Sequence, residues 1–206
     1  MAICSLRTDK VTIFDDLLPD DLFAQVWSSV QKEEFTIDRT VAEHSLYWRH
    51  GDVLAASSAP CDYSQPNNGY RDTFKDACLK IANQLGVAYS SFLSSVQLYG
   101  RGTKLSWHRD SGGAGTFAYY VHPEWKPTWG GELYVPEQDV RPESNKDRKL
   151  TYGKEMWDDL STGWGLWIAP KPNRLVYTAP DVLHQVNRVD PDAGDNLRVA
   201  VIGRLR

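Results

Sequence analysis

The sequence predicts a mostly β fold, a sandwich or jelly roll with two flanking α-helices. After Gly86, short runs rich in β-branched and aromatic residues alternate with turns of Gly, Pro, Asn and Asp, and no helical pattern separates them. Before Gly86, two stretches carry apolar residues at helical spacing. The length of 206 residues fits one domain. We therefore expect a single domain, with mainly helical support over 1–90 and a jelly-roll core over 91–206.

The two expected helices lie in the N-terminal part of the chain. Pro19-Asp20-Asp21 supplies the start signals of the first helix, whose apolar residues recur at helical spacing up to about Glu34. The second helix runs from about Tyr70 to Leu85 with its apolar residues on one stripe, and Gly86 follows as a C-terminal cap. We expect both helices to pack on the outside of the barrel.

The expected strands are short and separated by turns. They cover residues 92–99, 105–108, 116–121, 132–135, 165–168, 174–178, 184–189 and 197–204. Between two of them, segment 136–163 is polar and charged, and it is too long for a simple hairpin connection. Loops of that length tend to be lids or binding loops, so we expect one of these roles here.

Charge and aromatic content restrict the function classes. The formal net charge is −4 and the isoelectric point is about 5.7. Lys and Arg are scattered apart from the stretch 146–149, whereas nucleic-acid binders usually carry a basic patch, so we expect no nucleic acid as the main partner. Eight Trp and ten Tyr can fill a core or line a pocket that shields a reactive centre, and the composition leaves both uses open.

Cysteine usage and hydropathy indicate a soluble protein of a reducing compartment. The three cysteines, Cys4, Cys61 and Cys78, are an odd number without CxxC spacing, so they imply neither a disulfide framework nor a zinc ribbon. Residues 1–10 lack an apolar run of signal-peptide length. No stretch approaches the roughly 18 apolar residues that span a bilayer. We therefore expect a cytoplasmic location and no membrane partner.

A candidate metal site begins at Trp107-His108-Arg109-Asp110. In a strand, residues i and i+2 point to the same side, so His108 and Asp110 can reach one ion together. A third ligand must come from elsewhere, and the histidines of the chain are at positions 44, 50, 108, 122 and 184. His184 is distinctive because it begins an apolar strand soon after the turn Ala179-Pro180-Asp181. Two imidazoles and one carboxylate leave three octahedral positions open, as in non-haem iron(II) oxygenases.

The His-x-Asp pair alone carries little weight, because a histidine near an aspartate on a protein surface is commonplace. His-Arg-Asp is also the catalytic triplet of protein kinases. That class is excluded here, since the sequence has no Gly-rich loop, strand lysine or Asp-Phe-Gly motif with it.

Arg198 is the next unusual residue, because it lies inside the apolar run 197–202. A buried arginine needs an anionic partner, since its unpaired charge would be costly. The partner can be an internal Asp or Glu, or it can be the distal carboxylate of a dicarboxylic co-substrate held by a bidentate contact. The residues themselves leave both alternatives open.

The order of these pieces resembles a family, the 2-oxoglutarate- and iron(II)-dependent dioxygenases, and within it the prolyl-4-hydroxylase-like branch. The likeness covers roughly residues 92–206. Its motifs, in order, are Val96-Gln97-Leu98-Tyr99-Gly100 with Gly102, then Trp107-His108-Arg109-Asp110, Tyr119-Tyr120-Val121-His122-Pro123-Glu124-Trp125, Gly130-Gly131-Glu132-Leu133, Ala169-Pro170-Lys171-Pro172-Asn173-Arg174-Leu175-Val176, and finally His184-x-Val186 with Arg198. His122 departs from the pattern, since it replaces the commoner Asn.

The resemblance implies a double-stranded β-helix, cupin-like, with iron near one mouth. By position, His108, Asp110 and His184 would be the iron ligands. Arg198 would pair with the C5 carboxylate of 2-oxoglutarate, helped by the hydroxyl of Tyr120 or Tyr99, although both tyrosines can also be ordinary core aromatics. The implied cofactor and co-substrates are Fe(II), 2-oxoglutarate and O2, with ascorbate as a candidate reductant.

The implied reaction is the hydroxylation of an unactivated C–H bond, with release of succinate and carbon dioxide. Related halogenases lack the carboxylate ligand, so Asp110 favours hydroxylation over halogenation. A short chain without a peptide-binding extension favours a small amino-acid-like substrate or a specialised metabolite. Five residues near the motifs are candidates for substrate contact: Arg101, Trp107, His122, Trp125 and Arg188.

Three alternatives stand beside this hypothesis. A peptidyl or protein side chain, of the prolyl type, is the second candidate substrate. A non-catalytic jelly-roll binding protein is the alternative from another class, but the four intact residues His108, Asp110, His184 and Arg198 argue against it. Nucleic-acid demethylation by a relative of the alkylation-repair enzymes would use the same metal site, and the acidic charge argues against it.

Overall fold

The computed structural model describes residues 3–37, 55–65, 68–110, 113–138, 161 and 163–206. Its helices are α1 (Asp20–Val30) and α2 (Tyr70–Leu85). Its strands are β1 (Ile3–Arg7), β2 (Val11–Asp15), β3 (Phe35–Ile37), β4 (Ala55–Ser58), β5 (Phe92–Tyr99), β6 (Leu105–Arg109), β7 (Gly115–Tyr120), β8 (Leu133–Pro136), β9 (Gly165–Ile168), β10 (Leu175–Thr178), β11 (Leu183–Val186) and β12 (Arg198–Leu205). Two single-turn 3-10 helices cover Pro127–Trp129 and Pro191–Ala193.

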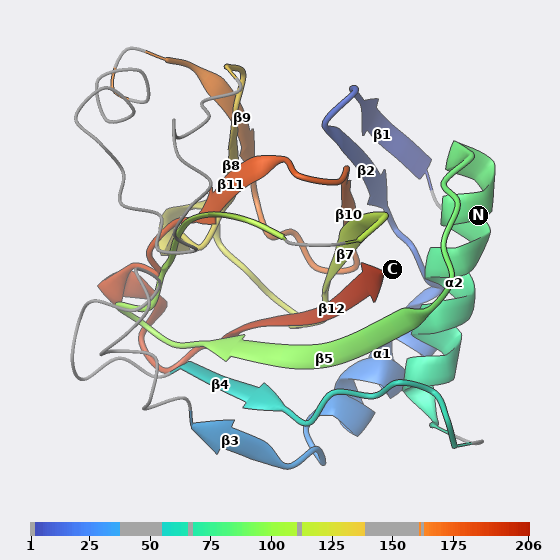
Figure 1. Cartoon of the computed structure of the whole chain (residues 1–206). Helices are drawn as coiled ribbons and strands as arrows, with labels where there is room; N and C mark the ends of the chain where they lie inside the picture. The colour runs from blue at the N-terminus through green and yellow to red at the C-terminus, as the bar shows by residue number, and fades with distance from the viewer. Residues whose placement is uncertain (1–2, 38–54, 66–67, 111–112, 139–160, 162) are drawn as a thin grey trace.

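The strands of the described residues form two sheets in which every paired neighbour is antiparallel. The larger sheet has the order β1-β2-β10-β7-β12-β5-β4-β3, and the smaller sheet has the order β6-β11-β8-β9. Because strands that are neighbours in the chain often belong to different sheets, the chain winds back and forth between two layers (Figure 1). This is the double-stranded β-helix that the resemblance implies.

Strand β12 organises the larger sheet from its centre. It pairs with β5 along its whole length, Arg198 opposite Tyr99 and Leu205 opposite Phe92, and its other edge pairs with β7. Side chains alternate between the faces of a strand. The even-numbered residues from 198 to 204 therefore face the smaller sheet, while the odd-numbered ones face the helices.

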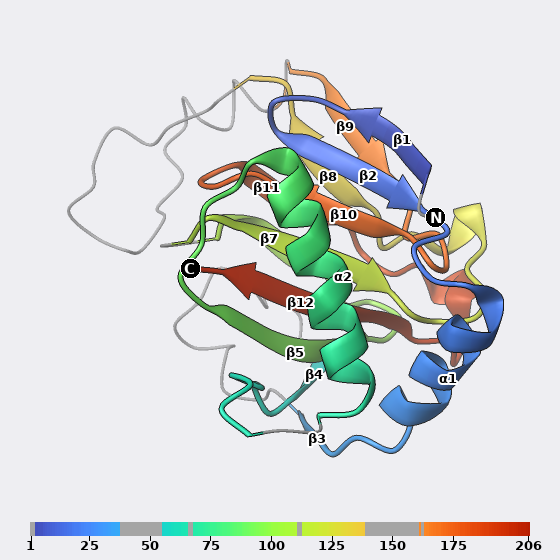
Figure 2. The same ribbon diagram turned by 90° about the vertical axis from the view of Figure 1, so that its right-hand side faces the viewer.

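Helices α1 and α2 cover the outer face of the larger sheet (Figure 2), as expected. The buried residues of α2, among them Phe74 and Ile81, pack with Phe117 and Leu205 of the sheet in one apolar core. The second core lies between the two sheets and includes Val135 and other aliphatic residues. The candidate site shares this inter-sheet space with the second core.

A buried ion pair ties the helical layer together. The guanidinium of Arg71, at the start of α2, donates from Nε and Nη2 to the Glu33 carboxylate at 2.8 and 2.5 Å. Nη2 also donates to the Ser58 hydroxyl of β4 at 2.9 Å. The side chains of Arg71 and Glu33 are 9% and 18% exposed, so this contact is shielded from solvent. It joins the turn after α1 to α2 and to β4, the strand next to the edge strand β3 of the larger sheet.

The two predicted helices and the strands predicted after Gly86 are confirmed with small shifts of their ends. Strands β5 and β9 have the predicted bounds, and so does helix α2, which Gly86 caps at a φ of 72°. Strand β11 stops at Val186 instead of residue 189, because its pairing with β6 is irregular beyond His184. Helix α1 ends at Val30, before the predicted Glu34, because the chain turns there into β3.

The first 90 residues contribute more than the helical support that we expected. Four strands, β1 to β4, extend the larger sheet at both of its edges. Residues 11–14 of β2 pair with β10, and β4 pairs with β5. These pairings are long-range in the sequence, so local patterning gave no sign of them.

One expectation lies mainly outside the described residues, namely the lid or binding-loop role of segment 136–163, of which only the ends are described. His44 and His50 also lie outside the described residues. Among the helices of the described residues, neither combines the length and the hydropathy that a bilayer crossing requires.

Candidate metal centre

Strand pairing brings the three predicted metal ligands together. Antiparallel β6 and β11 place His108 directly opposite His184, with ring centroids 4.1 Å apart. Asp110 follows the end of β6, two residues after His108 and on the same side. Its carboxylate oxygens lie 4.0 Å from His108 Nε2 and 3.7 Å from His184 Nε2. One ligand atom from each of the three residues lies within 4.8 Å of the other two.

The orientation of His184 suits a metal ligand. Its Nδ1 lies 2.9 Å from the backbone carbonyl of Val182, to which an Nδ1–H can donate, and its Nε2 is directed toward Asp110. A hydrogen bond at the second ring nitrogen fixes the tautomer and the ring plane of metal-bound histidines in general. Both histidines are buried, at 7% and 6% exposure.

Asp110 is held ionised by its surroundings. Burial opposes its charge and is the strongest influence on its pKa. Attraction to His184 and His108, a hydrogen bond from the Thr116 hydroxyl and the charge of Arg204 together outweigh burial, so the pKa lies below the ordinary aspartate value. Two imidazoles and one carboxylate are a donor set that a ferrous ion accepts, so the residues present fit this metal.

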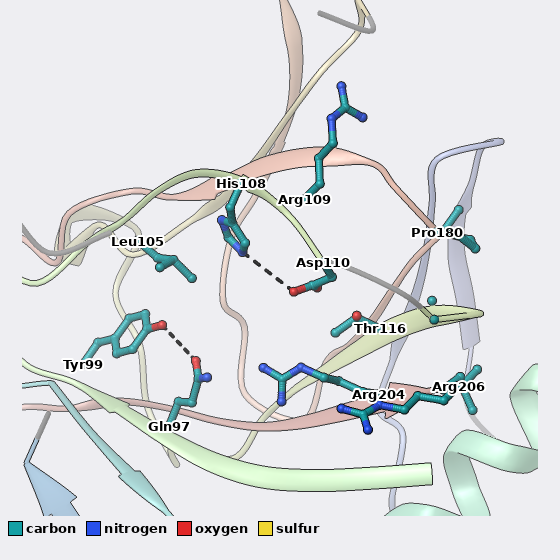
Figure 3. A pocket seen from close by; sticks show the side chains of 14 residues that line it. Gln97, Tyr99, Leu105, His108, Arg109, Asp110, Thr116, Pro180, Arg204 and Arg206 are labelled. Atoms are coloured by element: carbon teal, nitrogen blue, oxygen red, sulfur yellow. Dashed lines mark hydrogen bonds and ion pairs between the residues drawn. The ribbon is translucent and has the colours of Figure 1, made fainter. Parts of the chain in front are cut away.

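A cavity of about 390 Å³ opens beside the cluster (Figure 3). His108, Asp110, Tyr99 and Leu105 are among the residues that line it. Its other described lining residues are Gln97, Arg109, Gly113, Gly115, Thr116, Ala179, Pro180, Arg204, Leu205 and Arg206. The volume lies toward the lower end of the range of small-molecule pockets, roughly 300–1,000 Å³.

Arg198 packs against the ring of Tyr99, outside the described lining of the cavity, and is only 3% exposed. Its Nε donates to the carbonyl of Gly131 at 2.7 Å, and its Nη2 donates to the Tyr120 hydroxyl at 3.3 Å. Its Cζ lies 5.3 and 4.9 Å from the ring centroids of Tyr99 and Tyr120. Within the described part of the chain, no carboxylate forms an ion pair with Arg198. The internal salt bridge is therefore not found there, and the guanidinium fits an external carboxylate.

Gly131 makes room for this arginine. A Cβ at this position would lie 2.7 Å from Arg198 Cδ, and the residue adopts a φ of +75°. Both features disfavour a side chain at this position, since a positive φ is strained for residues other than glycine. The Gly-Gly-Glu-Leu motif thus has a local explanation at its second glycine.

The two tyrosines differ in what their hydroxyls contact. The Tyr120 hydroxyl meets Arg198, as the resemblance implies for one of the pair. The Tyr99 hydroxyl donates to Gln97 Oε1 at 2.8 Å instead, and burial raises the pKa of Tyr99 to about 12. The ring of Tyr99 still packs on the Arg198 guanidinium.

His122 and Trp125, two candidates for substrate contact, do not line the cavity. His122 is 2% exposed, accepts a hydrogen bond from the Val199 amide at Nδ1 and donates from Nε2 to the Pro170 carbonyl at 2.7 Å. Burial lowers its pKa to about 4, so it stays neutral in this role. Trp125 donates from Nε1 to the Gly130 carbonyl at 2.9 Å. These contacts hold the turns around Arg198 in place.

The other three candidates also lie away from the cavity lining. Trp107 alternates with His108 on β6 and therefore points to the opposite face of the smaller sheet, against Tyr134 at 5.4 Å between centroids. Arg101 is 64% exposed and pairs with Asp195 at 3.8 Å. Arg188 is exposed, and its backbone carbonyl accepts from the Gly131 amide.

Most lining residues of the cavity were not predicted from the sequence, among them Gln97, Thr116 and Arg204. Each of these three shares strand parity with a residue that was identified. Gln97 and Tyr99 face the same side of β5, and Arg204 and Arg198 face the same side of β12. The alternation of side chains along a strand could therefore have indicated these residues. Using it required knowing which end of each strand borders the metal cluster.

A double-stranded β-helix with a His-x-Asp pair and a distant histidine between its sheets defines the class of non-haem iron oxygenases. The model of the 2OG-Fe(II) oxygenase superfamily matches residues 94–203, more than half of the chain. The chain belongs to this superfamily. It is accordingly an oxygenase that depends on Fe(II), 2-oxoglutarate and O2. No curated protein matches the sequence.

Solved structures agree on the fold. A prolyl-4-hydroxylase from Pseudomonas putida is 17% identical, with a TM-score of 0.64, over 97% of this chain and 93% of that one. A Trichoplax adhaerens prolyl hydroxylase, solved with a peptide fragment of the hypoxia inducible factor oxygen degradation domain, is 16% identical, with a TM-score of 0.65, over 96% and 84%. The carbocyclase SnoK from nogalamycin biosynthesis is 14% identical, with a TM-score of 0.65, over 95% and 78%.

Proposed function

We propose that this oxygenase hydroxylates an unactivated C–H bond of a small amino-acid-like or specialised-metabolite substrate. The buried cluster of His108, Asp110 and His184 carries the proposal, because its three ligand atoms converge within 4.8 Å beside a cavity. In this role the two imidazoles and the carboxylate hold Fe(II) and leave the remaining positions to ligands from the cavity. When bound, the iron supplies the oxidation of the substrate by O2, coupled to the conversion of 2-oxoglutarate to succinate and carbon dioxide.

Arg198 binds the C5 carboxylate of 2-oxoglutarate in this proposal. Its burial makes the contact strong, because charge-assisted hydrogen bonds gain strength where water is excluded. The Gly131 carbonyl fixes Nε, which leaves the Nη atoms to the carboxylate. The Tyr120 hydroxyl accepts from Nη2 and keeps its own proton for the same carboxylate. Tyr99 packs on the guanidinium and limits its motion.

The size of the cavity supports a small substrate. About 390 Å³ beside His108 and Asp110 has room for a compact molecule, whereas a peptide would have to lie largely outside it. Solved relatives are described both with a peptide and from natural-product biosynthesis, so a peptidyl substrate is the alternative that the experiment must separate.

A substrate trial tests the proposal. Iron-loaded protein is supplied with 2-oxoglutarate, oxygen and either free amino acids or short peptides, and products are analysed by mass spectrometry together with succinate. A gain of one oxygen atom on a free amino acid, with one succinate per product, supports the small-substrate assignment. Oxygen gain on peptides alone would transfer the function to the peptidyl class.

A further inference from the structure

Arg204 is a second arginine of β12 that faces the space between the sheets. It lies six residues after Arg198, so their Cα atoms are roughly 20 Å apart at about 3.3 Å per residue. The two arginine side chains therefore leave β12 near opposite ends of the site. In Figure 3 the Arg204 side chain reaches into the middle of the cavity, toward Gln97, with His108 and Asp110 on the opposite wall.

This arginine has no counter-charge of its own in the described residues. Asp110 is the one acidic residue among the described residues that line the cavity, and Arg204 is not within 4.0 Å of its carboxylate or of any other described one. Once Asp110 binds a metal, the charge that attracts Arg204 is shared with that metal. A half-buried cation facing a cavity in this situation favours an anionic ligand.

The side-chain amide of Gln97 adds a neutral hydrogen-bond donor to the charged donor of Arg204 in the same cavity. The Tyr99 hydroxyl donates to Gln97 Oε1, so the amide nitrogen of Gln97 is the end that remains for a ligand. Gln97 and Arg204 both line the cavity. An amide N–H2 and a guanidinium that line one cavity offer donors for the two oxygens of a carboxylate.

We infer that Arg204, assisted by Gln97, binds a carboxylate of the substrate, so that the substrate is an acid and not its neutral analogue. The inference rests on the proposed function, in which Arg198 holds the C5 carboxylate of 2-oxoglutarate and His108, Asp110 and His184 would hold the iron. A further anion site beside this cluster then belongs to the molecule that is oxidised. Arg204 anchors it at one end and leaves its C–H bonds beside His108 and Asp110.

Matched acids and amides test this assignment. The probes are the free L-amino acids, their N-acetyl derivatives and the primary amides of both. Binding to the anaerobic protein loaded with iron(II) and 2-oxoglutarate is measured by calorimetry, and product formation in air by mass spectrometry. At least one acid is expected to bind tenfold or more tightly than its amide. In Arg204→Gln this ratio should fall to about one, while Arg204→Lys should retain part of it.

Two controls separate this inference from the proposed function. Arg7→Gln removes an exposed arginine on the edge strand β1 and should preserve the acid preference. The visible absorption band of the complex of iron(II) with 2-oxoglutarate should persist in Arg204→Gln, because that complex depends on the metal cluster and Arg198. If wild-type protein shows no band, the proposed function itself fails.

Three results overturn the inference while leaving the proposed function intact. The first is equal binding of acids and amides by wild-type protein that shows the band. The second is binding of no acid in the panel by such protein. The third is a loss of the band, or of 2-oxoglutarate affinity, in Arg204→Gln, since the arginine would then serve the metal cluster or the co-substrate.

Discussion

At the scale of single residues, a small number of named contacts holds each charged or metal-binding side chain of the site in position. Arg198 is fixed by one carbonyl and two tyrosine rings, and the chain makes space for it with a glycine. His184 is fixed by one backbone carbonyl. Such positions tolerate little change, because a shift of a fraction of an ångström alters both the geometry and the charge balance of the ligands.

Gly131→Ala should weaken 2-oxoglutarate binding without abolishing the metal site. The added methyl group would lie 2.7 Å from Arg198 Cδ, so the guanidinium must move. We expect the KM for 2-oxoglutarate to rise about tenfold, corresponding to about 1.4 kcal/mol of lost binding. Gly194→Ala is the matched control, because Gly194 also has a positive φ, +58°, but no atom within 4 Å of a new Cβ. An unchanged KM in Gly131→Ala would contradict the assignment of Arg198.

Asp110→Ala should reduce hydroxylation to background. The carboxylate is the only anionic group in the proposed ligand set, and its removal leaves two imidazoles to hold the metal. Product formation is measured by mass spectrometry at saturating iron and 2-oxoglutarate. Full activity in this variant would show that Asp110 is not a metal ligand and would contradict the proposed ligand set.

At the scale of elements, strand pairing determines which residues meet. The β6–β11 register sets His108 against His184, and the alternation along β12 sends Arg198 and Arg204 to the same face. The helices do not contribute to the cavity lining in the described residues, and their role is to cover the outer face of the larger sheet. The Glu33–Arg71 pair holds this cover in place.

Glu33→Gln should destabilise the fold by about 2 to 4 kcal/mol at pH 7, because it leaves the buried Arg71 guanidinium without its charged partner. Burial is the largest influence on the Glu33 pKa and raises it, but the hydrogen bonds and charge of Arg71 and the Tyr70 hydroxyl prevail, so the pKa lies below 4.5. The charged Glu33 carboxylate thus contributes fully to the free energy of unfolding above pH 4.5. This contribution is lost as the pH falls through the lower pKa of the folded state.

Urea unfolding of the wild type and Glu33→Gln at a series of pH values measures this effect. The difference in unfolding free energy between the two proteins should be largest near neutral pH and should shrink in the acid range. A difference that stays constant down to pH 3 would mean that the carboxylate charge of Glu33 is not the cause.

At the scale of the whole molecule, the part of the fold that could be predicted is the part with local signals. Alternation and turn residues marked strands β5 to β12, and the i, i+2 spacing put His108 and Asp110 on one side. Strands β1 to β4 were missed because their pairing with β10 and β5 is decided by partners far along the chain. Arg204 was missed for a related reason, since its proximity to the metal cluster follows from the packing of two sheets.

The central claim is that iron and 2-oxoglutarate meet at His108, Asp110 and His184 with Arg198 beside them. Anaerobic titration of the metal-free protein with iron(II), then with 2-oxoglutarate, tests it through the visible spectrum. We predict a weak charge-transfer band that develops with 2-oxoglutarate in the wild type and is absent from His184→Ala, with circular dichroism showing that the variant is folded. A folded wild-type protein without the band, or a band that persists in His184→Ala, would contradict the account.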